Sequence, residues 1–195
     1  MRAILERSNL LKSLNHVHRV VERRNTIPIL SNVLLSASGA SLEMKATDLD
    51  LEVTEATPAN VEQAGATTVP AHLLYDIVRK LPEGAEVMLR LDESGNSMSV
   101  VSGRSSFRLQ CLPQADFPEL SAGSFSHIFR LESEALKGLI DKTQFAISTE
   151  ETRYYLNGIY LHTHEEGGKL KLRSVATDGH RLARAEIEAP AGSEG

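Results

Sequence analysis

Leu30-Ser31-Asn32-Val33-Leu34-Leu35 returns later in the chain as Leu156-Asn157-Gly158-Ile159-Tyr160-Leu161, each time after a helical pattern. The helical pattern begins with Leu11-Lys12-Ser13-Leu14 in the first copy and with Leu136-Lys137-Gly138-Leu139 in the second. Short apolar runs bounded by polar or turn-forming residues are typical of strands. The chain therefore contains the same helix-then-strand unit more than once.

A further motif follows in the same order in both copies. Ala46-Thr47-Asp48 closes the first copy and Ala176-Thr177-Asp178 closes the second. The spacing between motifs drifts at the polar turn Glu165–Gly168, because insertions in loops disturb no core packing. Duplicated structural units leave this pattern in a sequence. The second copy then adds a histidine and an arginine, His180 and Arg181, which the first copy lacks.

Composition indicates an ordinary folded protein of one large or two small domains, and the repeat favours two. The 195 residues are 41 % hydrophobic and 24 % charged, with no tryptophan and one cysteine, Cys111. An aliphatic core can form from this composition without disulfides or a structural metal, and Cys111 is expected to be a buried thiol. Charges interrupt the N-terminal apolar residues, so we expect neither signal peptide nor membrane span, and a cytoplasmic location.

Periodicity predicts helices and antiparallel strands in an α+β fold. A strand is expected at 2–6, then a helix from an N-cap at Ser8 to about Arg23, and a second helix after Pro70. Further strands are predicted at 29–36, 41–46, 49–54, 86–91, 97–102 and 106–112. After these come a strand at 128–131, a helix at 133–147 and strands at 154–163, 170–176 and 180–187.

The segment Pro113–Gly123 is the best domain boundary, because prolines and small polar residues interrupt both periodicities there. The expected domains are 1–122, with two helix-plus-strands repeats, and 123–195, with one. The second domain therefore reads as the first half of a domain.

The first helix is predicted to be basic on its polar side. Lys12, His16, Arg19 and Arg23 are spaced at i, i+4, i+7 and i+11, and Arg24 adds a further cation. The net charge of −5 argues against a protein that coats nucleic acid over its whole surface, but it allows a local basic face. Concentrated positive charge suits phosphate contacts, which carry no sequence information. A solvated helix surface is the alternative interpretation.

Two polar clusters are candidate reaction centres. Asp178, His180 and Arg181 could form an acid/base or phosphate site, but no Ser or Cys nucleophile signature lies nearby, and a turn between strands is the simpler interpretation. His162 and His164 share one face of a predicted strand, as metal ligands do, although the glycines that follow favour a hairpin tip. We predict no catalytic residue, no metal and no cofactor, since nucleotide-binding loops are also absent from the sequence.

Longer motifs resemble the bacterial sliding clamp family, the beta subunit of DNA polymerase III. The most specific are Arg153-Tyr154-Tyr155-Leu156-Asn157-Gly158 and Val175-Ala176-Thr177-Asp178-Gly179-His180-Arg181-Leu182. The resemblance extends over the whole chain through Thr26–Asn32, Gly65–Ala71, Leu81–Glu86, Ser102–Phe107 and Leu112–Pro118.

The resemblance implies a non-catalytic processivity factor that encircles duplex DNA without reading its sequence. In that family two subunits of three similar domains form a closed homodimeric ring, with helices inside and sheets outside. The third domain is missing here, so the chain is expected to be a fragment that does not close a ring by itself. Two alternatives remain open. One is a metal-dependent hydrolase using His162, His164, Asp178 and His180, and the other is a β-rich interaction module without DNA.

The resemblance also implies the site residues. Arg24 matches a DNA-contacting arginine, and the residues expected near DNA are Lys12, Arg19, Arg23, Arg24, Arg79, Lys80, Tyr154 and Tyr155. The residues expected in a cleft for short linear motifs of the polymerase, the clamp loader and repair proteins are Tyr155, Leu156, Thr177, Gly179, His180, Arg181 and Leu182. His72 stands where the family can carry a basic residue, which weakens any DNA contact at that position.

Overall fold

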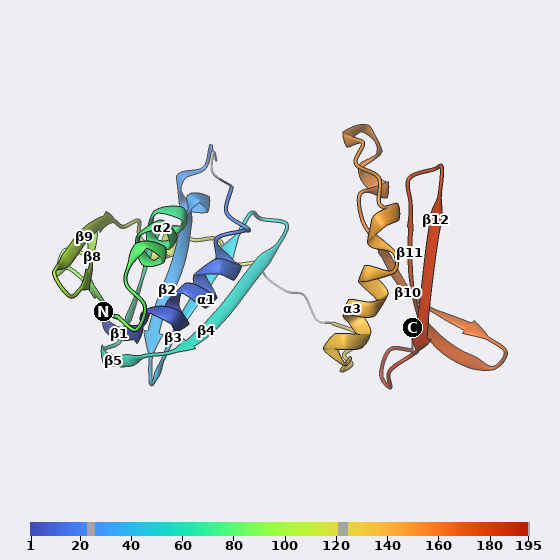
Figure 1. Cartoon of the computed structure of the whole chain (residues 1–195), viewed down its shortest axis with the longest axis horizontal. Helices are drawn as coiled ribbons and strands as arrows, with labels where there is room; N and C mark the ends of the chain where they lie inside the picture. Colours follow the sequence, from blue (N-terminus) through green and yellow to red (C-terminus); the bar gives the residue numbers. More distant parts are fainter. Residues whose placement is uncertain (23–25, 121–124, 195) are drawn as a thin grey trace. The chain divides into compact units, whose positions relative to one another are not determined.

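The computed structural model describes residues 1–22, 26–120 and 125–194, and the chain divides into two compact units, Met1–Ser121 and Ala122–Gly195 (Figure 1). Each unit combines helices with antiparallel sheets, which is an α+β organisation. Arg23 and Arg24 lie outside the described residues.

Within its described residues, the first unit contains two antiparallel sheets and two α-helices. One sheet has the strand order β5-β1-β7-β8-β9 and the other has the order β4-β3-β2-β6. Its elements are β1 (Arg2–Glu6), α1 (Arg7–Val17), the 3-10 helix η1 (Pro28–Ser31), β2 (Asn32–Ser38), β3 (Ser41–Thr47), β4 (Glu52–Pro58), β5 (Asn60–Gln63), β6 (Gly65–Pro70), α2 (Ala71–Lys80), β7 (Glu86–Leu91), β8 (Ser97–Ser102), β9 (Ser105–Gln110) and the 3-10 helix η2 (Gln114–Asp116).

One continuous core fills the first unit. The helices α1 and α2 contact each other (Figure 1). Leu14 of α1 and Leu74 of α2 are fully buried. They share one apolar cluster with Leu35 and Leu42 of one sheet and Leu89 of the other. Both sheets therefore bury one face against the same pair of helices, which is how alternating apolar residues on antiparallel strands are satisfied.

The second unit contains α3 (Ser133–Asp141), the 3-10 helices η3 (Gln144–Ala146) and η4 (Glu151–Leu156), and a sheet of β10 (Tyr160–Glu166), β11 (Lys169–Thr177) and β12 (Leu182–Glu188). Its buried apolar residues form two small clusters. Leu139, Leu172 and Ala185 make one, and alanines from η3, β11 and β12 make the other.

Charged side chains cross the other face of the second sheet. Arg173 lies opposite Glu186 in the β11–β12 register, and its Nε lies 2.6 Å from the Glu186 carboxylate. These side chains are only 12 % and 15 % exposed. Lys171 contacts both Glu186 and Glu166, and Arg184 also reaches Glu186. The half-buried pair sits at the centre of this network.

Several predicted boundaries were wrong in the first unit. The first helix ends at Val17 rather than near Arg23, because the His18 ring stacks on Tyr75 of α2 and Val21 turns back into the core. Ser8 is not the N-cap, since the helix follows β1 directly and the Ser8 hydroxyl donates to the Glu6 carboxylate.

Two strands of the first unit were not predicted. The strand β5 is an edge strand with mostly exposed polar residues, so it lacks an apolar alternation. The strand β6 pairs along its length with β2, although its sequence reads as a lead into α2. Both are recognisable only from the partner strand that each one pairs with.

The second unit also departs from the predicted elements. The segment 128–131 is not a strand, since it pairs with no described strand, and Ile128 and Phe129 are exposed. The predicted strand at 154–163 begins only at Tyr160, and its first residues belong to η4. The predicted helix at 133–147 ends at Asp141 and is followed by η3.

Candidate partner-binding and DNA-contacting sites

The turn between β11 and β12 is held by its own side chains. The Thr177 hydroxyl accepts a hydrogen bond from the Gly179 N–H at 3.1 Å and donates to the Arg181 carbonyl at 2.7 Å. One oxygen of the Asp178 carboxylate accepts the N–H groups of His180 and Arg181, both at 3.0 Å. The other oxygen pairs with the Arg181 guanidinium at 2.9 Å. The turn is therefore a pre-organised platform that presents Arg181 and His180 to solvent.

These hydrogen bonds lower the pKa of Asp178 from its ordinary value of 3.8 to about 2, chiefly through the backbone N–H groups of Arg181 and His180. Because the folded-state pKa is depressed, the stabilisation of the turn is fully present above about pH 4 and is lost as the pH falls through about 2. We expect an NMR titration to give an Asp178 midpoint near 2. An Asp178→Asn variant should lack that transition, and a midpoint at the ordinary value would contradict the observed hydrogen bonds.

A second set of contacts joins this turn to η4. Gly179 has φ +88°, and a Cβ there would lie 3.1 Å from a guanidinium nitrogen of Arg153. Arg153 donates to the Asp178 carbonyl at 3.4 Å and pairs with Glu150 at 3.0 Å. The left-handed backbone therefore favours glycine, and a larger residue would also have to displace the end of the Arg153 side chain slightly.

Asn157 fixes the end of η4. In the amide orientation that satisfies its bonds, its nitrogen donates to the carbonyl oxygens of Ser148, Glu150 and Arg153 at 2.9, 3.3 and 3.3 Å. The Ser148 N–H in turn donates to the Leu156 carbonyl at 3.0 Å. These bonds set the position of Leu156 without contributing to the cavity chemistry themselves.

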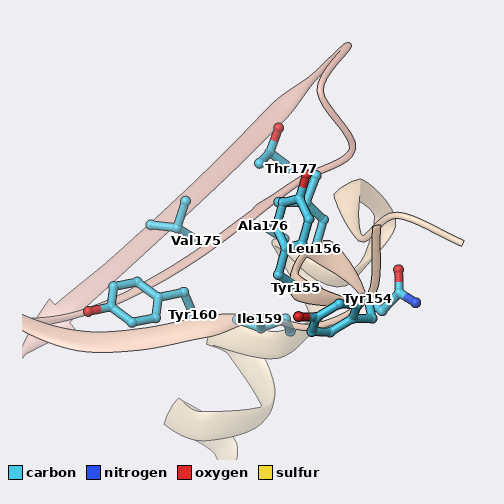
Figure 2. A pocket seen from close by; sticks show the side chains of 10 residues that line it. Tyr154, Tyr155, Leu156, Ile159, Tyr160, Val175, Ala176 and Thr177 are labelled. Atoms are coloured by element: carbon cyan, nitrogen blue, oxygen red, sulfur yellow. The ribbon is translucent and has the colours of Figure 1, made fainter. Parts of the chain in front are cut away.

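A shallow cavity of about 340 Å³ lies between η4 and the sheet, as Figure 2 shows. Its lining is Tyr154, Tyr155, Leu156, Asn157, Gly158, Ile159, Tyr160, Val175, Ala176 and Thr177. Tyr154 and Tyr155 are 77 % and 71 % exposed and meet edge to face at 5.8 Å. Exposed aromatic rings beside an apolar hollow are typical of surfaces that receive apolar side chains.

The structure brings together part of the predicted cleft. Tyr155, Leu156 and Thr177 line the cavity, while Gly179–Leu182 form the adjoining turn. Leu182 is 64 % exposed, and the Arg181 guanidinium lies 5.7 Å from the centre of the Phe145 ring. Sequence reasoning missed the lining role of Ile159, Tyr160, Val175 and Ala176, although the strand pattern places them beside the predicted residues.

The structure shows which of the predicted basic residues are exposed and which form ion pairs. Lys12 and Arg19 are exposed, but His16 lies 2.6 Å from the Glu55 carboxylate of β4. On α2, Arg79 pairs with Asp76 at 3.2 Å and Lys80 is exposed. Arg23 and Arg24 fall outside the described residues.

His72 makes a structural contact in place of a solvent-facing charge. Its Nε2 lies 2.7 Å from the Val21 carbonyl oxygen, and its ring meets the His18 ring edge to face at 5.6 Å. The imidazole therefore holds the segment after α1 against α2.

The proposed metal ligands do not converge. Across residues 1–22, 26–120 and 125–194, no three His, Cys, Asp or Glu side chains form a group that could hold a metal ion. His162 stacks on Tyr160 at 4.7 Å in place of meeting the other three side chains. The ligand set of the hydrolase alternative is therefore wrong. None of the described helices combines the length and the apolar character that a bilayer-crossing helix requires.

The fold belongs to a class, the α+β clamp proteins, in which units of helix and antiparallel sheet are repeated along the chain. Residues 1–121 match the family model of the N-terminal domain of the DNA polymerase III beta subunit, and residues 130–195 match its central domain. The chain belongs to the DNA polymerase III beta subunit family.

Comparisons with individual relatives agree with the family. The Beta sliding clamp of Caulobacter vibrioides is 55 % identical over 195 residues, which is 100 % of this chain and 52 % of the relative. That of Escherichia coli is 45 % identical over 184 residues, covering 94 % and 49 %. The chain spans about half the length of the curated relatives it matches.

Solved sliding clamps share the fold closely. A DnaN sliding clamp from Bartonella birtlesii bound to griselimycin superposes with a TM-score of 0.93 at 63 % identity, over 98 % of this chain and 51 % of that one. A Caulobacter crescentus beta sliding clamp gives a TM-score of 0.96 at 56 % identity, over 100 % and 52 %.

Proposed function

We propose that the chain supplies the DNA-facing and partner-binding parts of a non-catalytic sliding clamp, which keeps a replicative polymerase on duplex DNA. The observation that carries the proposal is family membership over both units, together with a pre-organised turn beside an apolar cavity. A ring that surrounds DNA needs only weak and mobile contacts, because topology prevents its escape. In the proposed complete protein, two subunits close the ring in the cytoplasm.

The DNA side of the proposal rests on exposed cations. Lys12 is exposed in the middle of α1 and Arg19 is exposed shortly after its end, in a protein whose net charge is negative. Contacts from such side chains to phosphates are independent of base sequence and allow sliding. The full set proposed to face DNA is Lys12, Arg19, Arg23, Arg24, Arg79, Lys80, Tyr154 and Tyr155. His72 is left out of this set, since its ring is engaged with Val21.

The partner side rests on the cavity and the turn. We propose that short apolar motifs of the polymerase, the clamp loader and repair proteins bind between η4 and the turn, with polar contacts from His180 and Arg181. The full set proposed for this cleft is Tyr155, Leu156, Thr177, Gly179, His180, Arg181 and Leu182. Griselimycin, which is bound to the Bartonella clamp, is a proposed ligand of this chain as well.

A hybrid clamp tests the function directly. Residues 1–195 would replace the matching segment of the Caulobacter vibrioides clamp, which supplies the remaining half. With the Caulobacter clamp loader and polymerase, the hybrid should extend a primer around a circular template in one binding event, and products without a clamp should be short. Cutting the DNA circle should release the hybrid, because only topology retains it.

Two further measurements with the hybrid test the role of the exposed cations and the encirclement of DNA separately. Combined Lys12→Ala and Arg19→Ala should slow loading, since less positive charge attracts the DNA, and leave retention on closed circles unchanged. Retention on linear DNA equal to that on circles would contradict encirclement. A folded hybrid that binds polymerase but never associates with DNA would favour an interaction module that does not use DNA.

A further inference from the structure

The turn between β3 and β4, residues 47–51, repeats three of the hydrogen bonds of the turn described above. The Thr47 hydroxyl accepts the Leu49 N–H at 3.0 Å. One oxygen of the Asp48 carboxylate accepts the N–H groups of Asp50 at 3.0 Å and Leu51 at 2.7 Å. We call this segment the Leu49 turn.

The correspondence extends to the backbone and to the neighbouring element. The backbone φ is +84° at Leu49 and +88° at Gly179, the equivalent position of the second unit. A 3-10 helix precedes the adjacent strand in both units, η1 before β2 and η4 before β10. The first unit therefore repeats the order of 3-10 helix, strand and turn that flanks the cavity of the second unit.

A leucine at the left-handed position is unfavourable, because only glycine adopts that conformation freely. The Leu49 side chain gains little from burial, being 45 % exposed, and Leu51 is 54 % exposed. Ile27, which directly precedes η1, is also 45 % exposed. A strained residue that presents an apolar side chain to solvent is accounted for by a contact outside the unit.

The charges of the two turns differ. Asp48 and Asp178 are equivalent, but the second turn continues to His180 and Arg181 where the Leu49 turn has Asp50 and Leu51. In the described parts of the chain, no salt bridge involves Asp48 or Asp50, and nearby Glu52 is neutralised by Lys45 at 3.2 Å. A complementary partner would bring positive charge next to its apolar side chains.

We propose that the Leu49 turn is a second docking surface, for a protein segment whose apolar side chains are flanked by lysine or arginine. This goes beyond the proposed function, which places partner binding in the second unit. The leucines supply the apolar contact and the two aspartates select the charge of the partner.

Fluorescence anisotropy with the full 195-residue chain tests the proposal. The probes are two labelled short peptides with the same leucines and phenylalanine, flanked by lysines in one and by glutamates in the other. The lysine peptide should bind more tightly than the glutamate peptide. Leu49→Gly and Leu51→Ser should each weaken lysine-peptide binding about tenfold, as truncation of an apolar anchor does.

The melting temperature distinguishes a docking role of Leu49 from a structural role. Leu49→Gly should raise the melting temperature, because glycine relieves the strained backbone, while it weakens binding. Leu73→Ala, at an exposed leucine of α2 outside both proposed binding surfaces, is the matched control and should leave lysine-peptide binding unchanged. Absence of binding to the parent chain, equal binding of both peptides, or unchanged binding by Leu49→Gly would overturn the proposal. Loss of binding only in a Leu182→Ser variant, in the turn of the second unit, would also overturn it, yet would leave the proposed cleft of the second unit intact.

Discussion

Leu14→Ala is expected to lower the free energy of unfolding of the first unit by about 2–5 kcal/mol. Leu14 is fully buried on the face of α1 that meets α2 and both sheets, so its removal opens a cavity in the one continuous core. A cavity costs the lost transfer energy and the lost packing contacts together. Urea denaturation followed by circular dichroism would measure the change.

Leu73→Ala is the matched control for this prediction. Leu73 lies on α2 but is 49 % exposed, so its truncation should change the free energy of unfolding by no more than about 0.5 kcal/mol. Equal losses in the two variants would mean that the helices do not bury the faces described above.

Leu182→Ser in the hybrid clamp is expected to weaken polymerase binding about 10–100-fold. Apolar anchors at the centre of an interface contribute about 2 kcal/mol or more, and each 1.4 kcal/mol corresponds to a tenfold change in affinity. Leu182 is 64 % exposed, so the substitution removes a contact surface without opening the core. Surface plasmon resonance with the Caulobacter polymerase would measure the affinity.

The same variant carries its own control. Retention of the Leu182→Ser hybrid on circular DNA should equal that of the parent hybrid, because encirclement does not use this side chain. Unchanged polymerase affinity would remove Leu182 from the cleft, whereas loss of both activities would indicate a folding defect.

Strands with a clear alternation between turn signals were predictable. The strands β7 and β8 occupy the predicted residues 86–91 and 97–102, since apolar alternation and flanking turn residues set both ends. The end of α1 was not predictable, because it depends on stacking between His18 and Tyr75, which are far apart in sequence. Strand β5 was missed for a similar reason, since pairing with β1 defines it.

The candidate site was predictable to a similar extent. The repeat drew attention to the turn after Thr177, and the family resemblance placed Leu156 near it. The tethers that build the site were not foreseen, because Arg153 and Asn157 act by donating to carbonyl oxygens, and such bonds follow no sequence periodicity. The repeat aligned Thr47-Asp48 with Thr177-Asp178, but it did not reveal that Leu49 adopts the left-handed backbone of Gly179, since a leucine rarely adopts that conformation.

The ion pair between Arg173 and Glu186 affects the register in which β12 pairs with β11. A slip of β12 by two residues keeps every side chain on its own face of the sheet. The apolar contacts would change little, because the slip exchanges Ala183 and Ala185, which are the same residue type. Such a slip in one direction sets Arg173 against Arg184, and in the other it places Glu188 opposite Arg173 and Glu186 opposite Val175. Like charges directly opposite each other oppose pairing. The charged residues therefore disfavour the first of these shifted registers, which the apolar residues alone would tolerate.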